Sequence, residues 1–245
     1  ARRGIHVFIE KPIALTAARG KRMADAVRAA GIVSQVGYHM RRGVAVRKLK
    51  AMLADKTAGR PVLFDARYDC NSLHGPWWRD AAKSGGQVFE QVIHLYDMAL
   101  FLLGEPQAVS GFTANLCHQG VPGYTAEDAS AASIRFASGA LANITGTNCA
   151  IPGEWNAGFT VVTEKVTAYF QPHNEAEFIY TDEDPVRRET VRDDTDVFEA
   201  ETAAFLAAVR GKGPQVAPIS EGYVGLQMVE AVLVSSSKGG DSVHL

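Results

Sequence analysis

One lysine follows an apolar run in a way that suits a ligand-binding site. In HVFIEKPIAL, residues 6–15, the apolar residues lead directly into Glu10, Lys11 and Pro12. Pro12 restricts Lys11 to an extended conformation, and the bond between them is a candidate for the cis form. Ligands of open α/β folds bind beyond the carboxyl ends of parallel strands. If residues 5–9 form such a strand, Lys11 lies at a binding edge. A solvated surface charge is the alternative interpretation.

A second set of polar side chains lies inside an otherwise apolar segment, GGQVFEQVIHLYDMALFLLG. Gln87, Glu90, His94 and Asp97 are spaced i, i+3, i+7 and i+10, which aligns them on one face of an α-helix. We expect the apolar remainder to be buried. Because one helical turn separates Glu90 from His94, the carboxylate could orient the imidazole for general acid–base catalysis near neutral pH. The same face could instead contact water or form a structural pair.

The composition fits a globular enzyme and excludes several other classes. The chain has 245 residues, a net charge of -2 and 47% hydrophobic residues, which suits one large domain or two smaller ones. The near-neutral balance gives no basic face for nucleic acid or a membrane surface, and no charge-free apolar stretch of about 18 residues occurs. Cys70, Cys117 and Cys149 are few and far apart, so we expect no disulfide framework, no metal site and a cytoplasmic location.

The first part of the chain predicts a parallel α/β unit. Residues 5–9 and 33–37 have the apolar character of short strands. Between them, Thr16 can cap a helix that ends near Ala30, with Gly31 after its last turn. A strand–helix–strand unit with short links implies parallel strands and a right-handed crossover.

The rest of the chain predicts an antiparallel sheet with helices. In residues 62–68 the alternation places Val62 and Phe64 on one buried face. We expect two hairpins over residues 133–147 and 159–170, and helices near 44–55, 197–210 and 221–237. A one-face apolar pattern indicates that helices cover only one side of the sheet. The polar stretch 181–196 is expected to be a solvated edge or loop.

These segments together resemble the glucose–fructose oxidoreductase / inositol dehydrogenase (Gfo/Idh/MocA) family. The resemblance is carried by EKP at 10–12, VGYHMRR at 36–42 and WWRDAAKSGGQVFEQVIHLYD at 77–97. The closing pattern FEAETAAFLAAVRGK…PISEGYVGLQMVEAVLVSSSKGG also fits, so the resemblance covers essentially the whole chain in order. It implies the last two strands of a Rossmann domain in residues 1–42. An α+β domain with a large, mostly antiparallel open sheet would follow in residues 43–245.

The resemblance also implies an activity and a set of site residues. The activity is NAD(P)-dependent hydride transfer between nicotinamide and a hydroxyl or carbonyl carbon of a sugar, polyol or related small molecule. Catalysis would fall to Lys11, His94 and Glu90, where sugar dehydrogenases of the family usually carry aspartate in place of Glu90. The implied cofactor contacts are Glu10, Lys11, Pro12 and Arg41, and the implied substrate contacts are Tyr38, His39, Trp78, Arg79 and Asp97. Trp78 and Asp97 could instead be structural, and Arg41 and Arg79 could be solvated or paired charges.

One departure from the family pattern concerns the dinucleotide phosphates. No GxGxxG loop occurs in the sequence, which starts at ARRGIHV. The resemblance therefore implies that about four Rossmann strands precede this sequence and that the phosphate-binding amides lie there.

Two other functions use the same fold. One is a non-catalytic binding or regulatory relative, which the presence of both Lys11 and His94 disfavours. The other is NAD-dependent glycoside cleavage, which uses similar residues. For either enzyme we expect a sugar-like small molecule as substrate and no nucleic acid or membrane partner. The resemblance also favours a homodimer or homotetramer formed through the C-terminal sheet.

Overall fold

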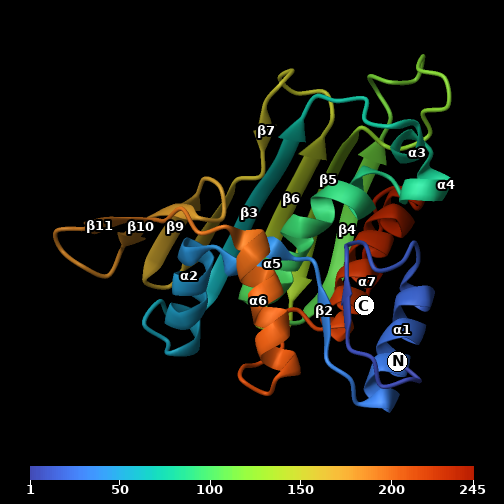
Figure 1. Cartoon of the computed structure of the whole chain (residues 1–245). Coiled ribbons are helices and arrows are strands. Elements are labelled where there is room, and N and C mark those ends of the chain that lie inside the picture. The colour runs from blue at the N-terminus through green and yellow to red at the C-terminus, as the bar shows by residue number, and fades with distance from the viewer.

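The computed structural model describes residues 1–245 and contains a two-stranded and a ten-stranded sheet (Figure 1). In the small sheet, β1 (Val7–Ile9) pairs with β2 (Ser34–Val36) in parallel, and α1 (Ala17–Ala30) connects them. The Thr16 side chain accepts from the Arg19 amide, and Gly31 ends the helix at φ 61°. The expected parallel unit is therefore confirmed.

The large sheet follows the order β11-β10-β9-β8-β3-β6-β5-β4-β12, with β7 paired to β3. Its only parallel pair is β3–β6. The strands are β3 (Pro61–Cys70), β4 (Pro106–Ala114), β5 (Ala129–Phe136), β6 (Leu141–Thr147), β7 (Trp155–Asn156), β8 (Phe159–Thr163), β9 (Val166–Phe170), β10 (Glu175–Tyr180), β11 (Arg187–Arg192) and β12 (Val243–His244). Both expected hairpins are confirmed, as β5–β6 and β8–β9.

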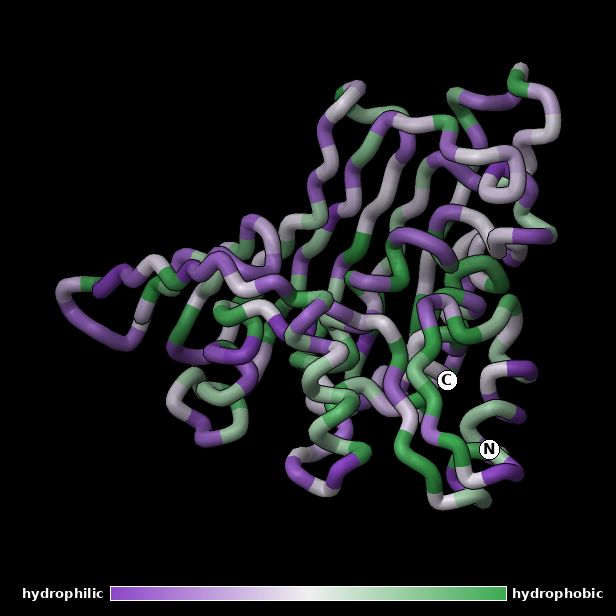
Figure 2. Tube along the Cα trace, in the orientation of Figure 1, coloured by the Kyte–Doolittle hydropathy of each residue, from purple (hydrophilic) through white to green (hydrophobic).

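Two details of the sheet qualify the sequence-based expectations. The polar stretch forms the exposed edge strand β11, and Figure 2 shows the β10–β11 hairpin as mostly hydrophilic. The placement of Val62 on the buried face was wrong, because the pairing of β3 with β8 shifts register between Pro61 and Leu63. This irregularity leaves Val62 48% exposed, whereas Phe64 is buried as expected.

Helices cover one face of the large sheet (Figure 1), as the one-face pattern predicts. They are α2 (Val44–Ala54), α3 (Pro76–Arg79), α4 (Ala81–Ser84), α5 (Ile93–Leu103), α6 (Val197–Val209) and α7 (Ile219–Ser237), with a 3-10 turn η1 (His39–Arg42) and a π-helical turn η2 (Val88–Val92). None of the helices combines the length and the apolar character that a membrane span requires.

Helix α7 joins the small sheet to the large one. It packs against α1 on one side and β4 on the other, and one buried apolar cluster extends from Ile13 and Val36 to strand β10. The close packing of these helices depends on glycine. A Cβ at Gly20 would lie 2.6 Å from Leu226 of α7, and a Cβ at Gly222 would lie 2.9 Å from Val36.

A buried arginine connects three of these elements. The Arg41 side chain in η1 is fully enclosed and donates to the Asp97 carboxylate of α5 from Nε (2.9 Å) and Nη2 (2.5 Å). Nη1 donates to the Val216 carbonyl at 2.9 Å and to Glu221 of α7. The Phe101 ring lies 4.7 Å from the guanidinium carbon. All three guanidinium nitrogens donate to an acceptor, and two carboxylates compensate the buried charge.

We predict that Asp97→Asn lowers the free energy of unfolding by roughly 3–5 kcal/mol, because it leaves the enclosed guanidinium without its carboxylate. Urea unfolding followed by circular dichroism measures this loss. Asp25→Asn is the matched control, since Asp25 forms ion pairs on the surface of α1, and it should leave the unfolding midpoint unchanged. Equal midpoints for the two variants would show that the buried pair is not important for stability.

Candidate active site

Lys11 lies where β1 ends, and its ammonium is held by Glu90. The Lys11–Pro12 peptide is cis, as the sequence suggested. Nζ donates to Glu90 Oε1 at 2.7 Å and to the Glu90 carbonyl at 2.5 Å. Both side chains are largely but not fully buried, at 15% and 20% exposure. The lysine is therefore a positioned charge, not a freely solvated one.

The second carboxylate oxygen of Glu90 also has a partner. Trp78 Nε1 donates to Glu90 Oε2 at 2.9 Å. The expected orientation of His94 by Glu90 is not found, because the Glu90 carboxylate bonds Lys11 and Trp78 instead. Glu90 lies in the π-helical turn η2, where the i→i+5 pattern widens the turn and displaces side chains from α-helical alignment.

The π-helical turn also divides the polar set expected on one helix face. Gln87 donates to Asn148 Oδ1 at 2.7 Å, and Asp97 bonds Arg41. Gln87, His94 and Asp97 are buried, so a water-facing stripe is excluded. Of the four residues, Glu90 and His94 are the two that lie close to Lys11.

His94 lies in a cluster of three histidines. Its ring is 4.9 Å from His39 and 6.2 Å from Tyr38, both approached edge-on. His39 in turn lies 5.4 Å from His173 and 4.5 Å from Phe198. Nδ1 of His94 is enclosed without a hydrogen-bond partner, which leaves Nε2 as the more accessible ring nitrogen. Tyr38 is itself only 2% exposed, so it packs against the histidine and presents little surface to a ligand.

The histidines of this cluster are held neutral. Burial lowers the pKa of His94 well below its usual range, and the charges of Lys11, His39 and His173 act in the same direction. Burial, His173 and Lys11 together lower the pKa of His39 to about 4. At neutral pH the site thus combines a fixed ammonium with a neutral imidazole that can accept a proton.

Two implied ligand contacts are not supported by the geometry. Arg41 is enclosed between the buried Asp97 and the partly exposed Glu221, and this pairing leaves the guanidinium no surface for a cofactor. The same pairing occupies Asp97, which is 1% exposed and was expected to contact substrate. The enclosure of both side chains in one ion pair supports a structural role for Arg41 and Asp97.

The remaining implied contacts differ in their surroundings. Arg79 donates to the carbonyls of Leu73 and His74, at 2.8 and 3.0 Å, and thereby braces that loop. Glu10 is exposed beside Gly37, where a Cβ would lie 2.7 Å from its carboxylate. Pro12 is half-buried next to Lys11. Arg79 therefore holds the loop at Leu73 and His74 in place, whereas Glu10 and Pro12 lie at the edge of the site, next to Lys11.

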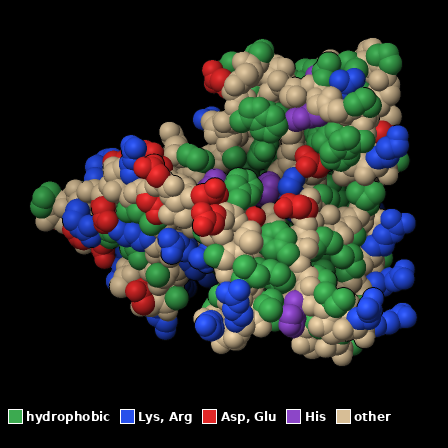
Figure 3. All heavy atoms as spheres, viewed as in Figure 1, with side chains coloured by type: hydrophobic (Ala, Val, Ile, Leu, Met, Phe, Trp, Pro, Cys, Tyr) green, Lys and Arg blue, Asp and Glu red, His purple; other side chains and the backbone are tan.

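An aromatic wall borders Glu90. The His74 ring lies 4.3 Å from Trp78 and 5.6 Å from Trp155, and Tyr124 lies 6.1 Å from Trp78. Trp155 is 58% exposed. Only Trp78 of this wall was expected from the sequence, because the other three rings lie in loops or in a two-residue strand that has no periodic pattern. Figure 3 shows histidine, acidic and basic side chains together in a hollow near the middle of the face shown.

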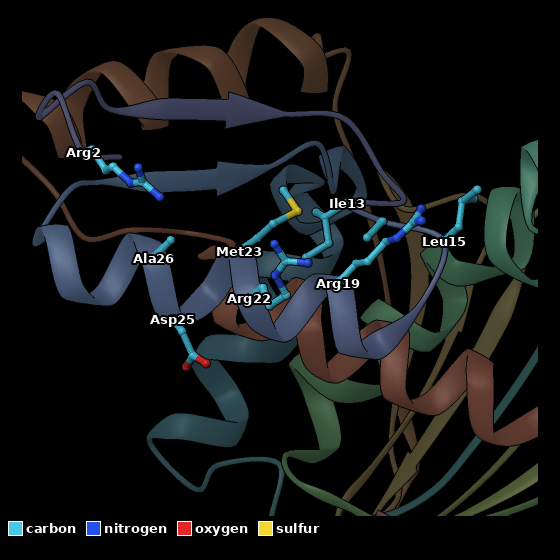
Figure 4. A pocket seen from close by; sticks show the side chains of 9 residues that line it. Arg2, Ile13, Leu15, Arg19, Arg22, Met23, Asp25 and Ala26 are labelled. Carbon is cyan, nitrogen blue, oxygen red and sulfur yellow. The ribbon is translucent and has the colours of Figure 1, made fainter.

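A large cavity lies apart from these residues. It has a volume of about 760 Å³ and lies beside α1 and the segment that precedes it, with Ile13, Leu15 and Met23 among its apolar lining residues (Figure 4). Arg19 and Arg22 border it. None of Lys11, Glu90 and His94 lines this cavity, so size does not identify the site.

We predict that the histidine cluster makes the fold sensitive to acid. The folded pKa values of His39 and His94 lie below the unfolded value near 6.5, so the unfolded chain binds more protons and stability falls as the pH drops below about 6.5. Each such histidine contributes a slope of up to about 1.4 kcal/mol per pH unit. Urea unfolding at pH 7.5 and 5 measures the loss, which His39→Gln should reduce. An identical loss in the variant would contradict this origin.

Comparison with known protein families matches both parts of the chain. Residues 46–169 match the GFO/IDH/MocA C-terminal domain. Residues 1–38 match the oxidoreductase family with an NAD-binding Rossmann fold. The first match covers half of the chain, and the second includes Lys11 but ends before Arg41.

Individual relatives align over nearly the whole chain. The 1,5-anhydro-D-fructose reductase of Ensifer adhaerens is 28% identical over 97% of this chain and 72% of the relative. The D-glucoside 3-dehydrogenase of Escherichia coli K12 is 27% identical over 99% of this chain and 73% of its own length. The structure of levoglucosan dehydrogenase in complex with NADH and levoglucosan superposes with a TM-score of 0.90 at 22% identity, over 99% of this chain and 74% of that one. The chain belongs to the Gfo/Idh/MocA family of oxidoreductases.

Proposed function

We propose that this protein is an NAD(P)-dependent oxidoreductase that transfers hydride between nicotinamide and a hydroxyl or carbonyl carbon of a sugar or polyol. The observation that carries this proposal is the juxtaposition of the Lys11 ammonium and the neutral His94 at the end of β1. Family membership supports the reaction type, and so do the named relatives, a 1,5-anhydro-D-fructose reductase, a D-glucoside 3-dehydrogenase and a levoglucosan dehydrogenase.

The residues present fit the nicotinamide end of such a cofactor. β1 and β2 are parallel, and Lys11 follows directly from the carboxyl end of β1, where ligands of this fold class bind. Glu10, Lys11 and Pro12 would contact the cofactor at this edge. A bound nicotinamide ring would supply the hydride acceptor or donor. Residues 1–245 contain no GxGxxG loop, so we assign no residue to the phosphates.

Lys11 and His94 would divide the work on the substrate hydroxyl. The Lys11 ammonium would hydrogen-bond the reacting oxygen and stabilise the negative charge that develops there. Nε2 of His94 would accept the hydroxyl proton in oxidation and return it in reduction. Glu90 would keep Lys11 in place, because its carboxylate and carbonyl both bind the ammonium. A fixed lysine reduces the ordering cost of reaching the reactive geometry.

The aromatic wall supports a substrate with both polar and apolar faces. Sugar rings present C–H groups on one face and hydroxyls at the rim, which suits aromatic side chains beside charged ones. Trp78 lies between the charged residues and the aromatic ones, because its indole N–H donates to Glu90 while its ring packs against His74. We therefore place the substrate ring between the aromatic wall and Lys11, with His39 beside His94.

We predict that Lys11→Met and His94→Gln each lower kcat/KM at least 100-fold, a typical loss for a general acid–base residue. Absorbance of the reduced cofactor measures this with NAD and NADP against levoglucosan, myo-inositol and methyl glucosides. Lys21→Met and His244→Gln are matched controls on exposed residues and should keep full activity. A fluorescence titration with NADH and NADPH shows separately whether the chain binds the cofactor.

The alternatives give different outcomes in these assays. Full activity of the Lys11→Met variant would show that Lys11 has no role in the mechanism. Cofactor binding without turnover of any substrate would favour a binding or regulatory relative. Release of free sugar from a glucoside without net cofactor reduction would favour glycoside cleavage by transient oxidation.

We also propose a domain division and an assembly. The two family matches meet between residues 38 and 46, which supports a boundary near 42. Leu63, Leu141 and Tyr169 are exposed at positions that alternate with buried ones in β3, β6 and β9, which places them on the sheet face away from the core. Exposed apolar side chains on an open sheet favour self-association. We propose a homodimer or homotetramer through this face.

We predict that Leu141→Arg converts this oligomer to a monomer, since a charge in the centre of an apolar contact remains unpaired. Sedimentation velocity at micromolar concentration measures the change. Leu206→Arg on α6, also partly exposed, is the control and should keep the oligomer. A monomeric wild-type chain at that concentration would refute the assembly.

A further inference from the structure

Two cysteines that are far apart in the sequence meet a buried carboxylate at one end of the large sheet. Cys117 lies in the β4–β5 connection, Cys149 follows β6, and Asp128 precedes β5. One ligand atom from each residue lies within 4.8 Å of those of the other two. None of the three residues contacts Lys11 or His94, so the cluster is separate from the proposed active site.

We propose that Cys117, Asp128 and Cys149 bind a thiophilic divalent metal ion, with zinc as the expected ion. Two thiolates and one carboxylate, completed by water, form a tetrahedral set that zinc accepts. Thiolate ligands select zinc and similar ions over magnesium and calcium, which prefer oxygen. This proposal departs from the expectation of no metal site, which followed from cysteine spacing alone, because the three ligands lie in separate segments.

The carboxylate of this cluster is fixed before any ion binds. Asp128 is fully buried, and its Oδ2 accepts from the amides of Cys117 (2.7 Å) and His118 (3.0 Å) and from His118 Nδ1 (3.0 Å). Oδ1 accepts only from the Leu116 amide, at 2.8 Å, and keeps a lone pair for a cation. These bonds also hold the Cys117 backbone next to the carboxylate, so the site is partly preorganised.

Cys149 is held from the opposite side. Its amide donates to Thr147 Oγ1 at 3.0 Å, and this hydroxyl donates to the Asp128 carbonyl at 2.9 Å. Cys117 is exposed and gives an ion a path into the cluster. Burial, together with Cys117 and Asp128, raises the pKa of the Cys149 thiol to about 12 in the metal-free protein. A bound cation reverses this effect, because it stabilises the thiolates and neutralises the carboxylate.

The ion would have a structural role. Through Cys117, Asp128 and Cys149 it would link the β4–β5 connection, residues 115–128, to the end of β6. Tyr124 of this connection packs against Trp78, and Asn148 of the β6 end donates to the Tyr124 hydroxyl at 3.1 Å. Metal binding would therefore restrict the movement of Tyr124 and, through it, of Trp78 in the aromatic wall. This effect does not depend on the proposed reaction.

Cobalt titration of the full, reduced chain tests the site. We expect a thiolate-to-cobalt absorption band that saturates at one ion per chain, and zinc should displace it. Cys117→Ser and Cys149→Ser should each weaken cobalt binding at least tenfold. Cys70→Ser is the matched control, because Cys70 is a buried cysteine outside the cluster, and it should bind cobalt as the wild type does.

A second measurement uses only the wild-type chain and does not depend on how the variants fold. Zinc should slow alkylation of Cys117 and Cys149 by iodoacetamide, as read by peptide mass spectrometry, and leave the rate at Cys70 unchanged. No cobalt band in a chain whose thiols are all reduced would overturn the proposal. So would a band that persists in the Cys117→Ser/Cys149→Ser double variant, or a Cys117–Cys149 disulfide whose reduced form binds no metal.

Discussion

A guanidinium can be fully enclosed only if its surroundings supply opposite charge and acceptors in fixed directions, and Arg41 imposes this requirement on the centre of the molecule. Asp97 on α5 and Glu221 on α7 meet it, so both helices take one orientation relative to η1. Tyr38 and His39 precede Arg41 in the chain, and His94 lies one turn before Asp97. The buried pair therefore brings the histidines together although its own side chains are enclosed.

The π-helical turn η2 complements this arrangement. It leaves His94 on the regular helix that Asp97 anchors, and it turns Glu90 toward Lys11 and Trp78. The π-helix is rare, and single π-turns are frequent at functional sites because they re-aim one side chain without breaking the helix. Here the result is that one carboxylate links the end of a parallel strand to the aromatic wall, which α3 and the loops provide.

Much of the fold could be predicted because its determinants are local. Thr16, Gly31 and the alternation in β5 and β6 are readable within a few residues of each element. The proximity of Lys11 to Glu90 and His94 followed from family resemblance and not from periodicity. The burial of Arg41 and Asp97 as an ion pair could not be predicted, because a charged residue does not show in sequence whether it will be buried with a partner. His173 and Tyr124 were missed because loop residues enter a site through tertiary contacts alone.

The single parallel pair in the large sheet has a consequence for how the chain folds. β3 pairs with β6 in parallel and with β8 in antiparallel, and neither strand is its neighbour in sequence. The hairpins β5–β6 and β8–β9 form by closing short loops. β3 can pair only after β6 and β8, which lie far along the chain, have come close to it. We therefore expect the centre of the sheet to form after its flanking hairpins, with β3 inserted between two preformed edges. The long-range pairing of β3 with β6 and β8, and not the formation of the hairpins, would then limit the rate at which the core is assembled.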